Sequence, residues 1–298
     1  MTATQSDTAA VAGRVVNGWP VPSGRWVPAE GRGSVFVREV AGPPGAPVVV
    51  LLHGLGATSG LQFAPTMNQL GEEFRVLAVD MRRTTSVPDG PQGLFEGVAD
   101  DVASVLKDCG LSHVIVLGYS IGGLVARVLV RRHPELVAGV VFAATFDRVP
   151  QGLWTAPLRR AGSALALLPQ VPRVRIGLPG QKASDAPPDE LDGGLGRWFA
   201  GEVGKLHPAV LSAALRDTIR VEIPTTAELG ERPLAFIITT RDRLIAPRWQ
   251  RAFAATAPDA PVFEVAAGHA ASGLSPTKFG PVALAACRSV SDRLAGAR

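Results

Sequence analysis

The chain is poor in cysteine, and the positions of its cysteines exclude two kinds of site. Cys109 and Cys287 are the only two in 298 residues, and neither belongs to a C-x-x-C pair or lies near a histidine cluster. A disulfide framework and a thiolate zinc site are therefore excluded. The first residues lack the basic start and the continuous apolar segment of a secretory signal, so we expect a cytoplasmic protein.

Long hydrophobic runs and a large excess of one charge are also missing. The longest nearly apolar stretch, residues 136–146, falls well short of the roughly 18 residues that begin to suggest a membrane span. The 30 basic residues are scattered along the chain and balanced by 26 acidic ones. We therefore expect neither a transmembrane segment nor a nucleic-acid partner. The composition leaves the oligomeric state open.

What the sequence does contain is a regular alternation of strand and helix patterns. Short apolar runs rich in β-branched residues are separated by longer segments with helical periodicity. This order predicts the α/β fold class, with a parallel sheet covered by helices on both faces. The expected strands are 34–40, 48–52, 74–79, 113–117, 137–142, 234–239 and 261–265, and the expected helices are 94–109, 121–133, 247–256 and 279–294.

The alternation also predicts how the chain is divided. Residues 1–33 are rich in proline, glycine and tryptophan, and we expect them to form an N-terminal arm without a regular element. The strand rhythm disappears over 147–226, where short apolar segments contain arginine and proline. We interpret this stretch as a helical cap inserted into a core made of 34–146 and 227–298.

The sharpest motif is Gly118-Tyr119-Ser120-Ile121-Gly122, a G-x-S-x-G sequence between an expected buried strand and an expected helix. A serine on so tight a strand-to-helix turn is held clear of the sheet, which suits a nucleophile. The helix that begins at Ile121 directs its positive end toward a developing oxyanion, and the Ile121 N–H can donate to that oxygen. The alternative is a glycine-rich turn with an incidental serine.

A serine nucleophile needs a base, and the chain has five histidines. His269 follows the last expected strand, late in the chain, where the base falls in the order Ser, acid, His. We therefore predict that His269 is the general base. The other four are His113 at the start of an expected strand, His133 at the end of an expected helix, His53 at the end of an expected strand and His207 in the expected cap.

The carboxylate that orients the base has two candidates. Asp242 directly follows the strand expected at 234–239, and Asp147 follows the strand expected at 137–142. Either side chain could approach the histidine from a strand end. We favour Asp242 because of its place in the chain order, and the alternative for it is a solvated loop aspartate between two arginines.

The motif His53-Gly54-Leu55-Gly56 follows another buried strand. Its backbone can form the second wall of an oxyanion hole, with the Leu55 N–H as the second donor beside that of Ile121. This segment also begins a glycine-rich pattern that needs a separate interpretation.

Glycines after a strand can instead bind a nucleotide. Gly54, Gly56 and Gly60 are spaced as G-x-G-x-x-x-G, and Asp80 ends the next strand, where a ribose-binding acid would lie. This pattern keeps an NADP-dependent oxidoreductase open as an alternative. A short-chain reductase, however, would need a tyrosine with a lysine four residues on, whereas Tyr119 is the only tyrosine and position 123 is glycine.

Taken together, HGLG, GYSIGG, the late aspartate and the GH pair resemble the α/β-hydrolase fold family over roughly residues 30 to 295, and its bacterial members with a helical cap in particular. The resemblance implies a mainly parallel eight-stranded sheet, a cap at 147–226, no cofactor and no metal. It assigns the nucleophile to Ser120, the base to His269 and the acid to Asp242, with Leu55 and Ile121 at the oxyanion hole.

Two departures from the family pattern stand out. Family members usually have a D-x-R-G-x-G turn, where this chain reads Asp80-Met81-Arg82-Arg83-Thr84-Thr85-Ser86, so this loop must have a different shape. The glycine usual three residues before the acid is replaced by Thr239, and the proline expected four residues after it comes at Pro247.

Serine rather than aspartate at the nucleophile position disfavours the dehalogenase and epoxide-hydrolase branches of this family. We expect a serine hydrolase that cleaves a carboxylic ester, or a related acyl compound, of a small-molecule or lipid-like substrate. Acyltransferases, carbon–carbon bond hydrolases and perhydrolase-like enzymes share these motifs, and a non-catalytic binding protein could keep the fold. Apolar residues of the cap fit an acyl pocket or simple packing on the core.

Overall fold

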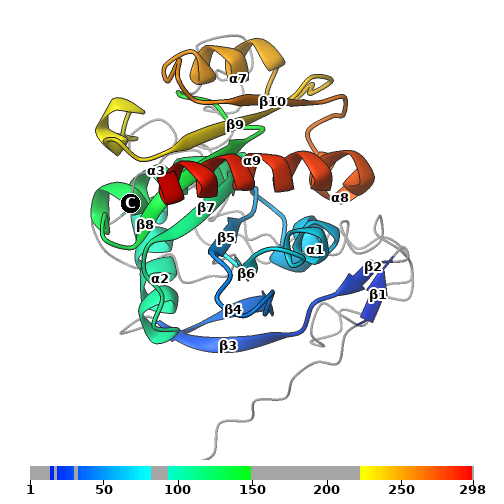
Figure 1. Ribbon diagram of the computed structural model, residues 1–298, viewed down its shortest axis with the longest axis vertical. Coiled ribbons are helices and arrows are strands. Elements are labelled where there is room, and N and C mark those ends of the chain that lie inside the picture. The colour runs from blue at the N-terminus through cyan, green and yellow to red at the C-terminus, as the bar shows by residue number, and fades with distance from the viewer. Residues whose placement is uncertain (1–13, 17–18, 30–32, 82–92, 149–221, 297–298) are drawn as a thin grey trace, which may run out of the picture.

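An eight-stranded sheet forms the centre of the molecule (Figure 1). The computed structural model describes residues 14–16, 19–29, 33–81, 93–148 and 222–296. The strands lie in the order β10-β9-β8-β7-β5-β6-β4-β3. Their bounds are β3 (Gly24–Ala29), β4 (Gly33–Val40), β5 (Val48–Leu52), β6 (Arg75–Val79), β7 (Val114–Tyr119), β8 (Val137–Ala143), β9 (Leu234–Thr239) and β10 (Val262–Val265).

The sheet is mainly parallel, which confirms the predicted fold class. Each neighbouring pair from β6 to β10 is parallel, whereas β4 runs antiparallel to both β6 and β3. The carboxyl ends of β5 and β7 to β10 therefore lie along one edge, which is where open α/β sheets bind ligands.

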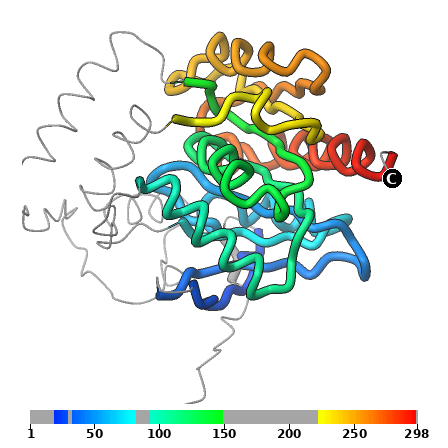
Figure 2. The backbone as a smooth tube through the Cα atoms, turned by 90° about the vertical axis from the view of Figure 1, so that its left-hand side faces the viewer, coloured from blue at the N-terminus to red at the C-terminus, as the bar shows by residue number. Residues whose placement is uncertain are grey.

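Helices cover both faces of this sheet. In Figure 1, α9 crosses the front of the sheet over β7, β8 and β9. Figure 2 shows α2 and α3 side by side on the other face. The helices described are α1 (Ser59–Leu70), α2 (Leu94–Asp108), α3 (Ile121–Arg132), α7 (Pro247–Ala254), α8 (Ala271–Leu274) and α9 (Pro276–Gly296).

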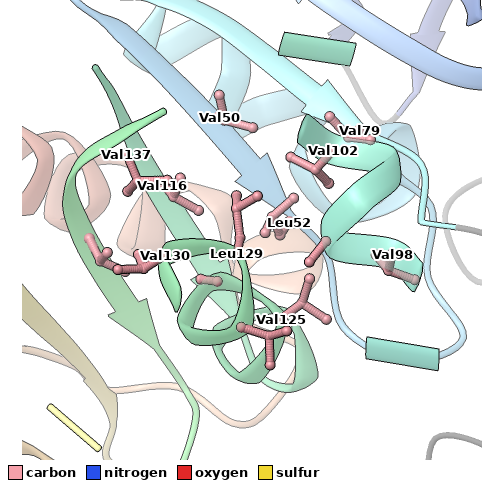
Figure 3. Close-up of a cluster of buried hydrophobic side chains, with 14 of the residues drawn as sticks. Val50, Leu52, Val79, Val98, Val102, Val116, Val125, Leu129, Val130 and Val137 are labelled. Atoms are coloured by element: carbon pink, nitrogen blue, oxygen red, sulfur yellow. The ribbon is translucent and has the colours of Figure 1, made fainter. Parts of the chain in front are cut away.

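Alternation of side chains along each strand explains the two covered faces. Val50 and Leu52 of β5 belong to one buried cluster, whereas Val49 and Leu51 belong to another on the opposite face. In Figure 3, the first cluster packs Leu52 against residues from α2 and α3, among them Val102 and Leu129. Strands buried on both faces read as continuous apolar runs, which is why β5 and β7 were recognisable in the sequence.

Before residue 34 the expectation of an irregular arm was wrong for several residues. Residues 24–29 form β3 at the edge of the main sheet, and β1 (Arg14–Val16) pairs with β2 (Trp19–Val21) in a separate two-stranded sheet. The prolines misled the prediction: Pro28 lies on the edge strand β3, where a missing N–H can face away from the ladder.

The predicted cap falls mostly outside the described residues, which include only 147–148 and 222–226 of it. The boundaries assigned to the arm, core and cap remain predictions. Within the described part of the chain, no helix combines the length and apolar character needed to cross a membrane.

Candidate active site

Ser120 occupies the turn between β7 and α3. Its backbone lies at φ 54° and ψ −122°, a region that side-chain-bearing residues rarely adopt. Such a conformation costs on the order of 1–3 kcal/mol and persists where the surrounding structure enforces it. Here the Ser120 N–H donates to the carbonyl of Ala143 on β8 at 2.8 Å, and its own carbonyl accepts from Gly123 at 2.9 Å.

The glycines two places before and after Ser120 are required by close backbone contacts. A Cβ on Gly118 would lie 2.6 Å from the carbonyl oxygen of Gly122. A Cβ on Gly122 would lie 2.2 Å from the carbonyl oxygen of Leu52 on the neighbouring strand. The G-x-S-x-G spacing therefore reflects the tightness of this turn against β5.

His269 lies in the loop between β10 and α8 and contacts the serine. Its Nε2 is 3.0 Å from Ser120 Oγ, which is hydrogen-bond distance. Tyr119 supports this loop, because its hydroxyl donates to the His269 carbonyl at 2.7 Å and its ring lies edge-on to the imidazole. Burial, with the nearby charge of Asp242, raises the pKa of Tyr119 well above its usual value, so this hydroxyl stays protonated.

Asp242 is the carboxylate that His269 binds. His269 Nδ1 lies 2.7 Å from Asp242 Oδ2, and the Asp242 side chain is fully buried. Burial acts to raise the pKa of this carboxyl, but hydrogen bonding to His269, the charge of the imidazole and donors from Ile245 and Thr239 outweigh it. The pKa of Asp242 is therefore held below its usual value.

Asp147, the competing candidate, is paired elsewhere. Its Oδ1 lies 2.7 Å from Nη2 of Arg127, whose side chain is fully buried on α3. Arg127 also donates to the backbone carbonyls of Asp147 and Pro224. The structure thus brings Asp242, rather than Asp147, to the histidine.

The loop after β5 lies against the serine. A Cβ placed on Gly54 would be 3.4 Å from Ser120 Cβ, so this loop and the turn are in close contact. Leu55 follows Gly54 directly and is 37% exposed, and Ile121 begins α3 immediately after Ser120. Leu55 and Ile121 are therefore next in sequence to the two residues in contact, Gly54 and Ser120, and their role in an oxyanion hole stays a prediction.

No sequence pattern predicted the residue of α1 that holds this loop. The Gly54 N–H donates to Oε1 of Gln62 on α1 at 2.8 Å, and Gln62 is buried. The helix α1 itself was not predicted, because Gly60 and Pro65 interrupt its pattern. Without that helix, nothing in the sequence places Gln62 beside the loop.

The other three histidines that the structure describes have neighbouring polar groups. His53 is buried, and its Nε2 accepts the Met81 N–H at 2.9 Å, so its proton sits on Nδ1, which lies 2.8 Å from the Gly54 carbonyl. His133 ends α3 and lies 2.8 Å from Asp100. His113 is exposed beside Ser112, and His207 lies outside the described residues.

The features that suggested a nucleotide have other partners as well. Asp80 accepts the Ser59 N–H at 2.6 Å at the start of α1, which satisfies a free donor of that helix. The Gly54 N–H is already bound to Gln62. Across the described ranges, no three His, Cys, Asp or Glu side chains cluster as a metal site would need.

The arrangement can move a proton. Asp242, His269 and Ser120 form a continuous hydrogen-bonded chain from a buried carboxylate to a hydroxyl on a strained turn. A neutral imidazole in this position can accept the hydroxyl proton, and the carboxylate can stabilise the resulting imidazolium.

Comparison with known proteins agrees with the fold. The family model described as alpha/beta hydrolase fold matches residues 47–276. A protein of Mesorhizobium japonicum, 2-(acetamidomethylene)succinate hydrolase, is 25% identical over 252 residues, which cover 83% of this chain and 88% of that protein. A Serratia proteamaculans protein named for a carbamate hydrolase activity is 37% identical over 102 residues, only 37% of its own length.

Solved structures agree with the same assignment. A thermophilic esterase from Thermogutta terrifontis superposes with a TM-score of 0.65 at 21% identity, covering 90% of this chain and 98% of that one. At this identity the likeness shows the fold. With the family model matching most of the chain, the protein is a member of the α/β-hydrolase fold family and an enzyme of the hydrolase type.

Proposed function

We propose that this protein hydrolyses a carboxylic ester or related acyl compound through an acyl-enzyme formed on Ser120. The observation that carries the proposal is the unbroken hydrogen-bonded chain from Asp242 Oδ2 through His269 to Ser120 Oγ. The hydroxyl at its end sits on the strained turn at the start of a helix. This combination of nucleophile, base and orienting acid is what acyl transfer requires.

The reaction would run in two steps. Ser120 Oγ attacks the substrate carbonyl carbon while His269 Nε2 takes its proton, and the tetrahedral oxyanion accepts hydrogen bonds from the Leu55 and Ile121 N–H groups. His269 then gives the proton to the leaving oxygen as the C–O bond breaks. In the second step, His269 takes a proton from the water that attacks the acyl carbon. It returns this proton to Ser120 Oγ as the acyl C–O bond breaks and the acid product leaves.

The same residues make an acyl-enzyme whichever acceptor follows. If an alcohol rather than water takes the acyl group, the protein is an acyltransferase, and the two outcomes differ in the product formed. We propose a small-molecule or lipid-like acyl substrate and a reaction that needs no metal or nucleotide. Product analysis with a simple aryl ester shows whether water or an alcohol accepts the acyl group. The same assay after dialysis against a chelator shows whether activity needs a metal or a nucleotide.

A fluorophosphonate probe tests the nucleophile, because only an activated serine reacts readily with it. We expect one label, at Ser120, found by peptide mapping. Ser112 provides an internal control, since its Oγ also lies near a histidine, 3.3 Å from His113 Nδ1, but on an exposed surface. Labelling of Ser112, or no labelling of the folded protein, would contradict the proposal.

A further inference from the structure

The Asp242 carboxylate is held by neutral donors in addition to His269. Its Oδ1 accepts the N–H groups of Leu244 and Ile245, each at 2.8 Å. Its Oδ2, the oxygen that faces His269, lies 2.8 Å from the Thr239 hydroxyl. Gln250 Nε2 also lies 3.2 Å from Oδ2, a longer contact than the others. A carboxylate has about four lone-pair sites, so these donors and the histidine saturate it.

Gln250 on α7 sets the direction of the Thr239 hydroxyl. The Thr239 N–H donates to Gln250 Oε1 at 3.0 Å, which fixes the orientation of the carboxamide. Gln250 Nε2 then donates to the Ile245 carbonyl at 2.7 Å and to Thr239 Oγ1 at 2.9 Å. Because Thr239 Oγ1 accepts from the amide, its single proton is free to point at Asp242.

The resulting chain of hydrogen bonds runs from Gln250 Nε2 through Thr239 Oγ1 to Asp242 Oδ2 and meets the His269 Nδ1–H there. All three supporting side chains are at least 95% buried: Thr239 is 0% exposed, Gln250 3% and Asp242 4%. In a low-dielectric interior each such bond polarises the next, so the chain strengthens the hold on the carboxylate.

We propose that Thr239 and Gln250 are positioning residues that set how strongly Asp242 acts on His269; this inference rests on the proposed function. The Thr239 hydroxyl shares Oδ2 with the imidazole and withdraws part of its charge. The carboxylate therefore stays ionised while His269 is neutral. Once the imidazolium has formed, the carboxylate does not stabilise it so strongly that His269 fails to pass its proton on.

The proposal is tested by removing the hydroxyl at constant shape. In Thr239→Val we expect kcat on an aryl ester to fall about 10- to 100-fold with KM nearly unchanged, as befits a lost hydrogen bond to a charged group. The acidic limb of the kcat/KM profile should move to higher pH by about half to one unit, because the carboxylate then holds the imidazolium more strongly. Thr239→Ser keeps the hydroxyl, so its kcat and its acidic limb should match those of the wild type.

The ionisable side chains that contact His269 include Asp242 and Tyr119 from β7. Burial keeps the Tyr119 hydroxyl protonated through the range of this profile. Gln250→Met should give a smaller loss in the same direction. The two losses should not add in the double variant, since both break the same chain.

Thr240→Val is the matched control. Thr240 is the next residue, its hydroxyl lies 3.3 Å from the Val265 carbonyl, and it makes no hydrogen bond with Asp242. We expect its kcat and pH profile to match the wild type. If Thr239→Val does not fold, Gln250→Met and Thr239→Ser still carry the test.

Two results would overturn the proposal: an acidic limb that is unmoved or moves to lower pH in Thr239→Val and Gln250→Met, or equal losses in Thr239→Val and Thr240→Val. Fluorophosphonate labelling of the wild type is measured in the same series. An unlabelled Ser120 in folded wild type means that the proposed function has failed, whereas a labelled Ser120 with an unmoved limb means that only the positioning proposal has failed.

Discussion

Asp242 and Asp147 follow neighbouring strands of the sheet, yet they have different partners. Asp242, after β9, is fully buried and bound by His269 and by neutral donors. Asp147, after β8, has a side chain 30% exposed and is paired with the buried Arg127. Position at a strand end is therefore not enough to identify a candidate catalytic acid. The two aspartates are distinguished by their partners, a histidine for Asp242 and an arginine for Asp147.

The two clusters also perform different tasks in the molecule. Arg127 on α3 binds the backbone at Asp147 and at Pro224, the two described points on either side of 149–221. This contact joins chain segments that are far apart in sequence, so it contributes to stability. The Asp242 cluster joins the ends of β9 and β10, and in the proposed function it contributes to catalysis. Substitutions should separate these two contributions.

The largest expected effect follows from removing the nucleophile at the end of the Asp242 cluster. Ser120→Ala should lower turnover by up to ~10⁶-fold, because the members of such a triad act as a unit. The free energy of unfolding should not fall, since the backbone at φ 54° strains alanine no more than it strains serine. Measured kcat and a urea unfolding curve check both parts. Turnover within tenfold of wild type would remove Ser120 from the mechanism.

Breaking the Arg127–Asp147 pair should instead lower stability. Arg127→Met leaves Asp147 without its buried partner and removes the stacking of the guanidinium on Phe253. We expect the free energy of unfolding to fall by about 1–3 kcal/mol, because the carbonyls of Asp147 and Pro224 lose their charged donor while the partly exposed Asp147 carboxylate can be solvated. Denaturant unfolding measures it. A loss below about 1 kcal/mol would show that Arg127 does not hold this region together.

The lowered pKa of Asp242 predicts a pH dependence of stability. The unfolded chain binds a proton at this carboxyl more readily than the folded chain, so the stabilisation is complete above the unfolded pKa and is lost as the pH falls through the folded pKa. Wild type should therefore lose more stability than Asp242→Asn on acidification from pH 5 downward. Parallel slopes for the two proteins would contradict the assigned shift.

The smallest effect is expected at a third aspartate, which also binds a histidine. Asp100 accepts from Arg132 at 2.8 Å and 2.9 Å and lies 2.8 Å from His133, near the surface. Solvent screens such pairs, so Asp100→Asn should cost at most about 1 kcal/mol of stability and leave kcat unchanged. A fall in kcat in the folded variant would mean that the Asp100–His133 contact matters for activity, which would contradict this prediction.

Much of the fold was predictable because its signals are local. Strands such as β5 and β9 are continuous apolar runs, and their predicted bounds agree with the structure. The edge strand β3 was not predictable, because Trp26 is 67% exposed and Pro28 argues against a strand. Helix α1 was hidden by Pro65, although Thr58 caps its start through the Leu61 N–H.

The candidate site was predictable only in part, for a physical reason. Ser120 is marked by a turn whose neighbours must be glycine, which is a local constraint. The choice between Asp242 and Asp147 depends on which of two adjacent strand ends the histidine loop reaches, and chain order gave only a preference. Gln62 and Gln250 lie only 8 and 11 residues after their partners Gly54 and Thr239. No motif marks either glutamine, because each contact depends on how a helix packs against the end of a strand.

The most direct test of the account is the kcat/KM of Asp242→Asn compared with Asp147→Asn on one aryl ester. Asparagine keeps the shape of each side chain and removes the charge, so both proteins should remain folded. We expect a loss of about 10⁴-fold in Asp242→Asn, as when a base loses its orienting carboxylate. In Asp147→Asn we expect a loss of less than about tenfold, since Asp147 pairs with Arg127 and not with His269. Wild-type activity in Asp242→Asn, with a collapse in Asp147→Asn, would contradict it.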